Sequence, residues 1–434
     1  MSFSEYAVRR QILAKKLPPQ TVAIIPAAKE RLRNGDAVYR FRQDSDFFYL
    51  TGFEEPEAVL FVFSGQEGES FLFNRPRNPA QEQWTGKILG QKEAVSLLGV
   101  QQAFDIATFS QRLPELLAQK NMVYLPLGRY PEYDKAIWKA IQFLKGEIRR
   151  GIACPGGVSD LDPLLSEMRL LKSDMEIALM KKAADISILG HQKAMQMCTS
   201  LHWEYELEAE LIGTFINHGA RGVAYEPIVG AGENACILHY SANNQPLAKG
   251  QMVLIDAAAE FGNYAADITR TFPVDGRFQG EQRAIYELVL KAQRAGIACI
   301  KPGVSWTLIQ QTIVRILTIG LCDLGLLKGD VDELIRQEAY KTFYMHNSGH
   351  WLGLDVHDCG QYKIHGEWRT LQPGMVLTVE PGIYITASIP DVDPRWWNIG
   401  VRIEDDILVT PDGYRNLTEA LPTTIHDIEA CMRG

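Results

Sequence analysis

Four acidic residues lie at the ends of, or within, strand-like apolar runs of this sequence. Asp256 ends the run MVLID, Glu380 ends MVLTVE, and Asp267 and Glu404 lie in YAADITRTF and GVRIEDDILV. A carboxylate on a buried strand costs free energy unless a partner compensates its charge. These acids could be exposed residues of ordinary strands, but the apolar runs before Asp256 and Glu380 favour a cation bound between carboxylates.

A tight hairpin would bring two of these acids together. The pair Gly262-Asn263 lies between two strand-like runs and is typical of such a turn. A two-residue turn there places Asp256 opposite Thr269. Asp267, two residues from Thr269, then projects from the same face as Asp256, because side chains alternate along a strand. Diagonal neighbours lie roughly 7–8 Å apart, a distance at which two carboxylates repel unless a cation lies between them.

Three of the nine histidines, His346, His350 and His357, lie in one segment, YMHNSGHWLGLDVHD. His346 and His350 have the spacing of the zinc-binding helix motif HExxH, but Asn347 replaces its glutamate and the following Ser-Gly pair disfavours a helix. Single histidines are often structural, yet three in a glycine-containing segment favour a functional site. Carboxylates with one imidazole suit Mn²⁺, Co²⁺ or Zn²⁺, and shared carboxylates suit two ions about 3.5–4 Å apart that activate water for hydrolysis.

The elements that position these residues are predicted to form two domains, since 434 residues exceed one ordinary core. Residues 1–170 mix apolar runs with helical patterns and indicate an α/β domain, with strands at TVAIIPA, AVLFVF and MVYLPLG and a helix at TFSQRLPELLAQK. Ser173 and Glu176 form a capping-box pattern that starts a long helix. In residues 171–434 the predicted helices and hairpins follow one another without a strict βαβ order, which indicates an α+β domain.

A short internal repeat occurs in the second predicted domain. KGQMVLIDAAAEF and QPGMVLTVEPGIY both run from a turn through Met-Val-Leu to a carboxylate. Each is followed by a second acidic run, which we expect to be a continuous strand. In GVRIEDDILV the alternation of residues then places Glu404 on one face with Arg402 and Asp406.

Composition excludes several classes of partner and location. The net charge of −9 argues against nucleic acid and anionic membranes as partners. The chain has no apolar run of the roughly 20 residues that a membrane helix needs, and no signal-peptide pattern at its N-terminus. Its seven cysteines are scattered without a CxxC pair, which is typical of free thiols in a reducing compartment. We therefore expect a cytoplasmic protein with a small or polar substrate.

Several segments resemble the metallopeptidases of the pita-bread fold. The likeness rests on LIDAAAEFGNYAADITRTF, HNSGHWLGLDVHD, LTVEPGIY and GVRIEDDI. YRFRQDSDFFYLTGFEEPEAVL and LFNRPRNPAQEQWTGKILG resemble the N-terminal domain of the aminopeptidase P branch, and MRLLKSDMEIALMKKA, IVGAGENACILHY and RTFPVDGRF extend the likeness to nearly the whole chain. The resemblance implies an N-terminal α/β creatinase-like domain, residues 1–170, followed by a pita-bread catalytic domain, residues 171–434.

The resemblance also implies a metal centre. The five family ligands fall on Asp256, Asp267, His350, Glu380 and Glu404, and none is replaced. Asp267 and Glu404 would bridge two divalent ions, Asp256 would complete one site, and His350 and Glu380 would complete the other. Mn²⁺ is the expected metal, with Co²⁺ or Zn²⁺ as alternatives.

The activity implied by the resemblance is release of the N-terminal residue from peptides with proline in the second position. A metal-bridging hydroxide would attack the first carbonyl, with Glu380 as general base. His357 would polarise the scissile carbonyl, and His239 would hold the leaving nitrogen side or the tetrahedral intermediate. Arg402 would orient the site electrostatically with Tyr384.

The remaining implied residues bind substrate. His346 would line the pocket for the proline ring, and Tyr225 would be a further substrate-binding residue. The N-terminal domain would serve oligomerisation and substrate access. In a homodimer or homotetramer, a neighbouring subunit would supply Trp84 as a pocket wall and Asp36 as a partner of Arg402.

Three other functions compete with this one. A prolidase has the same ligands but cleaves only Xaa-Pro dipeptides, and it needs groups that hold the proline carboxylate. Creatinase has this fold without metal, and some pita-bread domains only bind proteins. The complete ligand set argues against the last two functions.

Overall fold

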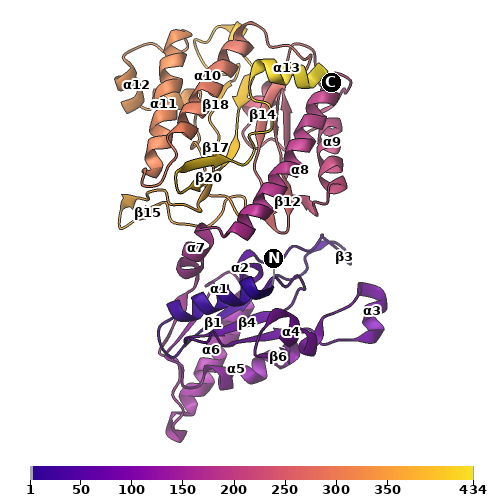
Figure 1. Cartoon of the computed structure of the whole chain (residues 1–434), viewed down its shortest axis with the longest axis vertical. Coiled ribbons are helices and arrows are strands. Elements are labelled where there is room, and N and C mark those ends of the chain that lie inside the picture. Colours follow the sequence, from indigo (N-terminus) through magenta and orange to yellow (C-terminus); the bar gives the residue numbers. More distant parts are fainter. Residues whose placement is uncertain (1–2, 434) are drawn as a thin grey trace. The chain divides into compact units, whose positions relative to one another are not determined.

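The computed structural model describes residues 3–433 (Figure 1). It divides into two compact units, residues 1–169 and residues 170–434. The division lies at the end of helix α7 (Asp162–Leu170). None of the helices in the described range is both long enough and apolar enough to cross a membrane.

The N-terminal unit is built on a six-stranded mixed sheet with the strand order β6-β5-β4-β1-β7-β8. β1 pairs antiparallel with β4 and parallel with β7. β1, β4 and β5 are buried along their whole length, so their sequences are continuous apolar runs without polar alternation. The strands predicted at TVAIIPA, AVLFVF and MVYLPLG are confirmed as β1, β4 and β7. The strands are β1 (Thr21–Pro26), β4 (Val59–Phe63), β5 (Ser70–Asn74), β6 (Gln102–Asp105), β7 (Met122–Leu125) and β8 (Gly157–Asp160).

Helices of the N-terminal unit enclose this sheet, and aromatic side chains fill its core. Phe109 of α5 contacts Phe61 and Phe73 of the sheet, with ring centroids 6.1 and 5.5 Å apart. The predicted helix is confirmed as α5, although it ends at Leu117. The helices are α1 (Phe3–Lys16), α2 (Ser45–Thr51), α3 (Pro79–Thr85), α4 (Gly90–Leu98), α5 (Phe109–Leu117) and α6 (Pro131–Gly146), and a hairpin joins β2 (Leu32–Asn34) to β3 (Ala37–Val38).

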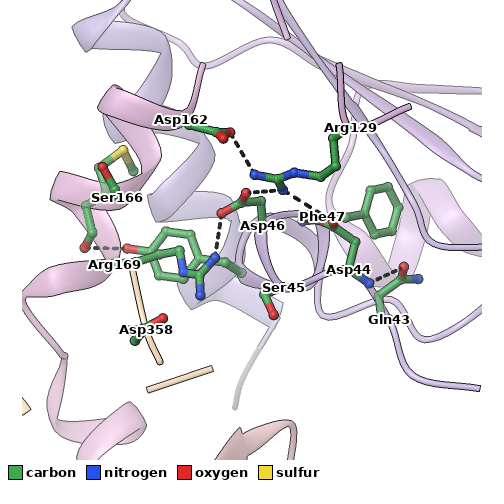
Figure 2. Close-up of polar contacts among 12 residues, drawn as sticks. Gln43, Asp44, Ser45, Asp46, Phe47, Arg129, Asp162, Ser166, Arg169 and Asp358 are labelled. Carbon is green, nitrogen blue, oxygen red and sulfur yellow. Dashed lines mark hydrogen bonds and ion pairs between the residues drawn. The ribbon is translucent and has the colours of Figure 1, made fainter. Parts of the chain in front are cut away.

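A charged cluster around the buried Asp46 and Arg169 ties α2 to α7 within the N-terminal unit (Figure 2). The carboxylate of Asp46 accepts hydrogen bonds from Arg169 at 2.8 Å and from Arg129 at 2.7 Å. Arg129 also donates to Asp162, the first residue of α7, at 2.8 Å. Burial alone would raise the pKa of Asp46, but the two guanidinium groups outweigh it and lower that pKa. The charges are therefore mutually compensated, which a buried ion cluster requires.

The C-terminal unit begins with the predicted long helix, α8 (Asp174–Cys198). Its capping box is confirmed, because the Ser173 side chain accepts from the Glu176 N–H and the Glu176 carboxylate accepts from the Ser173 N–H. α8 packs against α9, and α10 packs against α11. Figure 1 shows these two pairs flanking the strands of the unit. The other helices are α9 (Glu204–Asn217), α10 (Gly280–Ala298), α11 (Trp306–Asp323), α12 (Val331–Arg336) and α13 (Ile425–Arg433).

Small sheets form the centre of the C-terminal unit. The predicted hairpin register is confirmed, because Asp256 pairs with Thr269 and Phe261 pairs with Tyr264. The sheets are β10 (Ile228–Ala231) with β11 (Met252–Asp256) and β14 (Thr269–Pro273); β9 (Gly222–Val223) with β12 (Ala259–Phe261) and β13 (Tyr264–Ala265); β17 (Val376–Val379) with β20 (Asp405–Thr410) and β21 (Gly413–Asn416); β18 (Gly382–Ile385) with β19 (Ile399–Arg402); and β15 (Lys363–Ile364) with β16 (Glu367–Trp368).

The expectation that each acidic run is a continuous strand is wrong. YAADITRTF divides into β13 and β14, which lie in different sheets, with Asp267 between them. The run GVRIEDDILV is not one strand, because β19 ends at Arg402 and β20 begins at Asp405, in a different sheet. Between these two strands, the Glu404 N–H donates to the carbonyl of Thr269 at 3.1 Å, so the chain at Glu404 lies against the start of β14. Asp406 therefore does not share a face with Arg402. Its carboxylate accepts instead from the backbone N–H of Asp267 at 3.2 Å.

Candidate metal centre

Each of the four acids lies where the chain passes from one sheet to another. Asp256 is the last residue of β11, before the chain enters β12, and Asp267 lies between β13 and β14. In the second half of the unit, Glu380 lies between β17 and β18, and Glu404 lies between β19 and β20. The sequence repeat therefore corresponds to two broken hairpins, each with one acid at each break. Side chains at a break are free of the strand alternation and can converge.

His350 reaches these acids from a segment that lies against β17. Its N–H donates to Thr378 Oγ1 at 3.1 Å, and its carbonyl accepts from the Thr378 N–H at 2.9 Å. Its Nδ1 donates to the Trp351 carbonyl at 2.9 Å, so Nε2 faces the carboxylates, 3.3 Å from Asp267. A Cβ on Gly349 would lie 2.1 Å from the Thr378 carbonyl oxygen. Gly349 is thus required for the close approach to β17, and the segment is not a helix.

A cavity of about 260 Å³ brings the predicted residues together. All five predicted ligands line it, with His239, His346, His357 and Arg402 of the predicted catalytic and binding residues. The lining residues are Leu238, His239, Asp256, Asp267, His346, Asn347, Gly349, His350, His357, Glu380, Arg402 and Glu404.

The electrostatics of the cavity fit a bound cation. Burial, followed by the charges of neighbouring carboxylates, raises the pKa of Glu404 well above its usual range. Burial also raises the pKa of Glu380 to about 7, and Asp267 holds the pKa of His350 up at about 9 against the effect of burial. Ligand atoms of Asp267, His350 and Glu404 lie within 4.8 Å of one another. Crowded carboxylates with one imidazole are the donor set of Mn²⁺, Co²⁺ or Zn²⁺, so these residues fit the implied metal.

Arg402 organises one wall of the cavity. Its guanidinium donates to Asp256 at 2.5 Å, to the Tyr384 hydroxyl at 3.0 Å and to Thr269 Oγ1 at 3.2 Å. Because an arginine nitrogen can only donate, the Thr269 hydroxyl hydrogen is left for Glu404, whose Oε2 lies 2.6 Å away. Thr269 is not among the residues that the sequence predicts for this site. Its position opposite Asp256 in the hairpin register was the available signal.

The predicted binding residues Tyr384, His346 and Tyr225 are held by hydrogen bonds. His346 Nδ1 donates to the Asn347 carbonyl at 2.7 Å, and its Nε2 accepts from the Tyr384 hydroxyl at 2.8 Å. The Tyr225 hydroxyl donates to Asp256 at 2.5 Å, so it contacts one of the predicted ligands directly. These contacts fix the rings of His346 and Tyr384 in single orientations.

The other two predicted histidines also lie in the cavity. His357 packs edge to face on His350, with ring centroids 4.4 Å apart. Burial and the neighbouring His350 lower the pKa of His357. His239 lies in the cavity lining beside Leu238.

Trp84 and Asp36 belong to the N-terminal unit and do not line this cavity. Trp84 lies near the end of α3 with 88% of its surface exposed, and Asp36 is exposed at the turn between β2 and β3. Their predicted roles require a neighbouring subunit and stay predictions.

Comparisons with known proteins agree with this geometry. Residues 178–411 match metallopeptidase family M24, and residues 6–124 match the aminopeptidase P N-terminal domain. The Xaa-Pro aminopeptidase of Escherichia coli is 44% identical over 434 residues, covering 100% of this chain and 98% of its own, and that of Haemophilus influenzae is 46% identical over 430 residues, covering 99% and 97%.

Solved structures give the same result. The structure of Pseudomonas aeruginosa aminopeptidase PepP has a TM-score of 0.97 and 48% identity, covering 100% of this chain and 98% of that one. A variant of Escherichia coli aminopeptidase P in complex with substrate has a TM-score of 0.96 and 44% identity, with the same coverage.

Proposed function

The chain belongs to metallopeptidase family M24, and we propose that it acts as an Xaa-Pro aminopeptidase, a hydrolase that releases the N-terminal residue from peptides with proline second. The pita-bread architecture with an aminopeptidase P N-terminal domain, expected from the sequence, is confirmed by the family and structure matches. The observation that carries the function is one cavity that holds the complete ligand set together with His239, His346, His357 and Arg402.

Five residues would hold two divalent ions, with Mn²⁺ as the proposed metal: Asp256, Asp267, His350, Glu380 and Glu404. When bound, such ions supply Lewis-acid activation of water and of the scissile carbonyl. Glu380 takes the proton of the attacking water and returns it to the leaving nitrogen. His357 donates a hydrogen bond to the scissile carbonyl oxygen, and His239 holds the leaving-nitrogen side of the substrate.

Proline selectivity follows from rigid groups around the second subsite. A bond before proline has a tertiary nitrogen without N–H, so recognition must rely on the shape of the ring. The His346 imidazole is hydrogen-bonded at both nitrogens, and Tyr384 is in turn fixed by Arg402. A wall that does not rearrange selects a stiff ring over flexible side chains.

The cavity favours an aminopeptidase over a prolidase. A dipeptidase must bind the proline carboxylate with a cation, yet Arg402 is the only arginine or lysine among the residues that line the cavity. Arg402 is already paired with Asp256 and hydrogen-bonded to Tyr384. We therefore expect Xaa-Pro-Xaa peptides to be cleaved faster than Xaa-Pro. Cleavage confined to dipeptides would refute this choice.

The roles of the histidines are tested by pairing metal content with rate. His350→Ala removes an imidazole ligand, so bound Mn²⁺ measured by elemental analysis should fall. His357→Ala should keep the metal and lose turnover, because His357 contacts the substrate in this mechanism. Equal metal content in the two variants would show that their roles are divided wrongly. Wild-type protein without metal and without activity after addition of Mn²⁺ would support a non-catalytic binding function.

We also propose a cytoplasmic homodimer or homotetramer in which the N-terminal unit serves oligomerisation and substrate access. Trp84, exposed on α3, is suited to form a pocket wall for a neighbouring subunit. Asp36 would be a further acceptor for the Arg402 guanidinium, which already has three partners. Trp84→Ala should raise KM for Xaa-Pro peptides, and analytical ultracentrifugation measures the assembly.

A further inference from the structure

A second cavity adjoins the catalytic one in the C-terminal unit. Its volume is about 580 Å³, against about 260 Å³ for the catalytic cavity. The two cavities share four lining residues, His346, Asn347, Gly349 and His350. The segment that supplies the histidine ligand and the proposed proline wall is therefore also a border of the second cavity.

Aromatic side chains line much of the second cavity. Trp306, Tyr340, Tyr362 and Trp368 contribute to its walls, with Met345 beside them. Trp306 is held by Tyr362, with ring centroids 4.8 Å apart, so this wall is preformed. Such a lining suits an apolar or aromatic side chain.

The second cavity offers little to attract a charged group. Lys341 is the only lysine or arginine among its lining residues, and it pairs with Glu338 at 2.7 Å. Both of these side chains are exposed, so their charges are screened as well as mutually compensated. The lining therefore selects by shape and apolar contact, not by charge.

We propose that this cavity binds the side chain of the third or fourth residue of a peptide substrate and favours aromatic and large aliphatic residues there. The inference rests on the proposed aminopeptidase function, which places the first two residues in the catalytic cavity. The rest of the peptide must leave that cavity, and the fixed φ of proline gives it a defined direction. A chain that leaves past His346 follows the segment that borders both cavities, which brings its third or fourth residue to the second cavity.

The test compares two sets of tetrapeptides with the Mn²⁺-loaded enzyme, Ala-Pro-X-Ala and Ala-Pro-Ala-X, where X is glycine or phenylalanine. At one position at least, we expect kcat/KM to be roughly tenfold higher for phenylalanine, the factor for partial burial of an aromatic ring. Trp368→Ala should reduce this ratio to near one and leave the glycine peptides unchanged. Trp368 is 43% exposed on the short β15–β16 hairpin, so its removal spares the core.

A matched control is Trp397→Ala. Trp397 is 38% exposed and lines a different cavity of the same unit, so this variant should keep the wild-type ratio. Met345→Ala, at an exposed position of the second cavity, should lower the ratio like Trp368→Ala. Equal rates for glycine and phenylalanine at both positions, or a ratio untouched in both cavity variants, would overturn the inference. Failure to cleave any Xaa-Pro peptide would instead overturn the proposed function.

Discussion

Replacing Thr269 with valine tests whether a hydroxyl outside the ligand set orients a metal-binding carboxylate. Thr269 is fully buried, and its hydroxyl donates to Glu404 Oε2 at 2.6 Å while accepting from Arg402 Nε at 3.2 Å. Valine has nearly the same shape and is a good strand residue, so the change removes the hydroxyl with little effect on packing. Glu404 then loses the group that fixes its orientation, and the Arg402 Nε loses its acceptor.

The size of the expected loss in Mn²⁺ affinity follows from the charge of the Glu404 carboxylate, which accepts the hydrogen bond. A hydrogen bond to a charged group contributes about 1.5–3 kcal/mol, and each 1.4 kcal/mol is about tenfold in affinity. Groups that orient metal ligands change metal affinity by about 10–100-fold when removed. We therefore expect Thr269→Val to weaken Mn²⁺ binding by about 10–100-fold, measured by isothermal titration calorimetry on metal-free protein.

Two further variants separate this role from a general structural one. Thr269→Ser retains the hydroxyl and should bind Mn²⁺ within about threefold of wild type, a difference under 1 kcal/mol. The hydroxyl of Thr271, on the same strand, bonds to the backbone N–H and carbonyl of Arg402, so Thr271→Val should lower thermal stability more than metal affinity. Wild-type Mn²⁺ affinity in Thr269→Val, or equal losses in the valine and serine variants, would refute the reasoning.

Three other predictions concern catalysis, pH and stability. Glu380→Ala should lower kcat by at least about 100-fold with the fold intact, because it removes a general base, and near wild-type turnover with saturating Mn²⁺ would contradict this. Burial holds the pKa of His191 at about 4, below its ordinary 6.5. Between these pH values the unfolded chain binds a proton that the folded chain does not, so the free energy of unfolding falls as the pH drops, by at most about 1.4 kcal/mol per pH unit. Urea denaturation at pH 7 and pH 5 should show a smaller pH effect in His191→Gln than in the wild type. Arg169→Met leaves the buried Asp46 with one guanidinium fewer and should lower the free energy of unfolding, measured by chemical denaturation, by about 3 kcal/mol. The control Arg150→Met, at an exposed ion pair, should lower it by under about 1 kcal/mol. Equal losses in the two variants would refute the importance of the cluster.

Local patterns predicted the elements that depend on nearby residues. The capping box at Ser173 and the long helix after it follow from residues within a few positions. The register that pairs Asp256 with Thr269 follows from the two-residue turn between them. Continuous apolar runs predicted the buried strands of the N-terminal unit for the same reason. Resemblance supplied the ligand set, which spacing alone left open between metal ligands and exposed acids.

Sequence reasoning was wrong where the chain changes sheets. Alternation along GVRIEDDILV predicted one strand with Arg402, Glu404 and Asp406 on one face, but the structure breaks that strand at Glu404. The break is stabilised by a hydrogen bond to Thr269, a residue far away in the sequence. No local pattern encodes such a contact, because its energy comes from the other hairpin.

The sequence by itself determined the candidate ligands of the predicted metal centre, the two-part architecture and the short repeated runs that end in acids. Only the tertiary structure decided that all four acids lie at breaks between sheets, that Arg402 and Thr269 form the wall behind Glu404, and that an aromatic cavity borders the site. The reason is physical. Residue spacing specifies a hairpin or a helix, whereas a converging set of charges forms only when distant hairpins pack and bury it together.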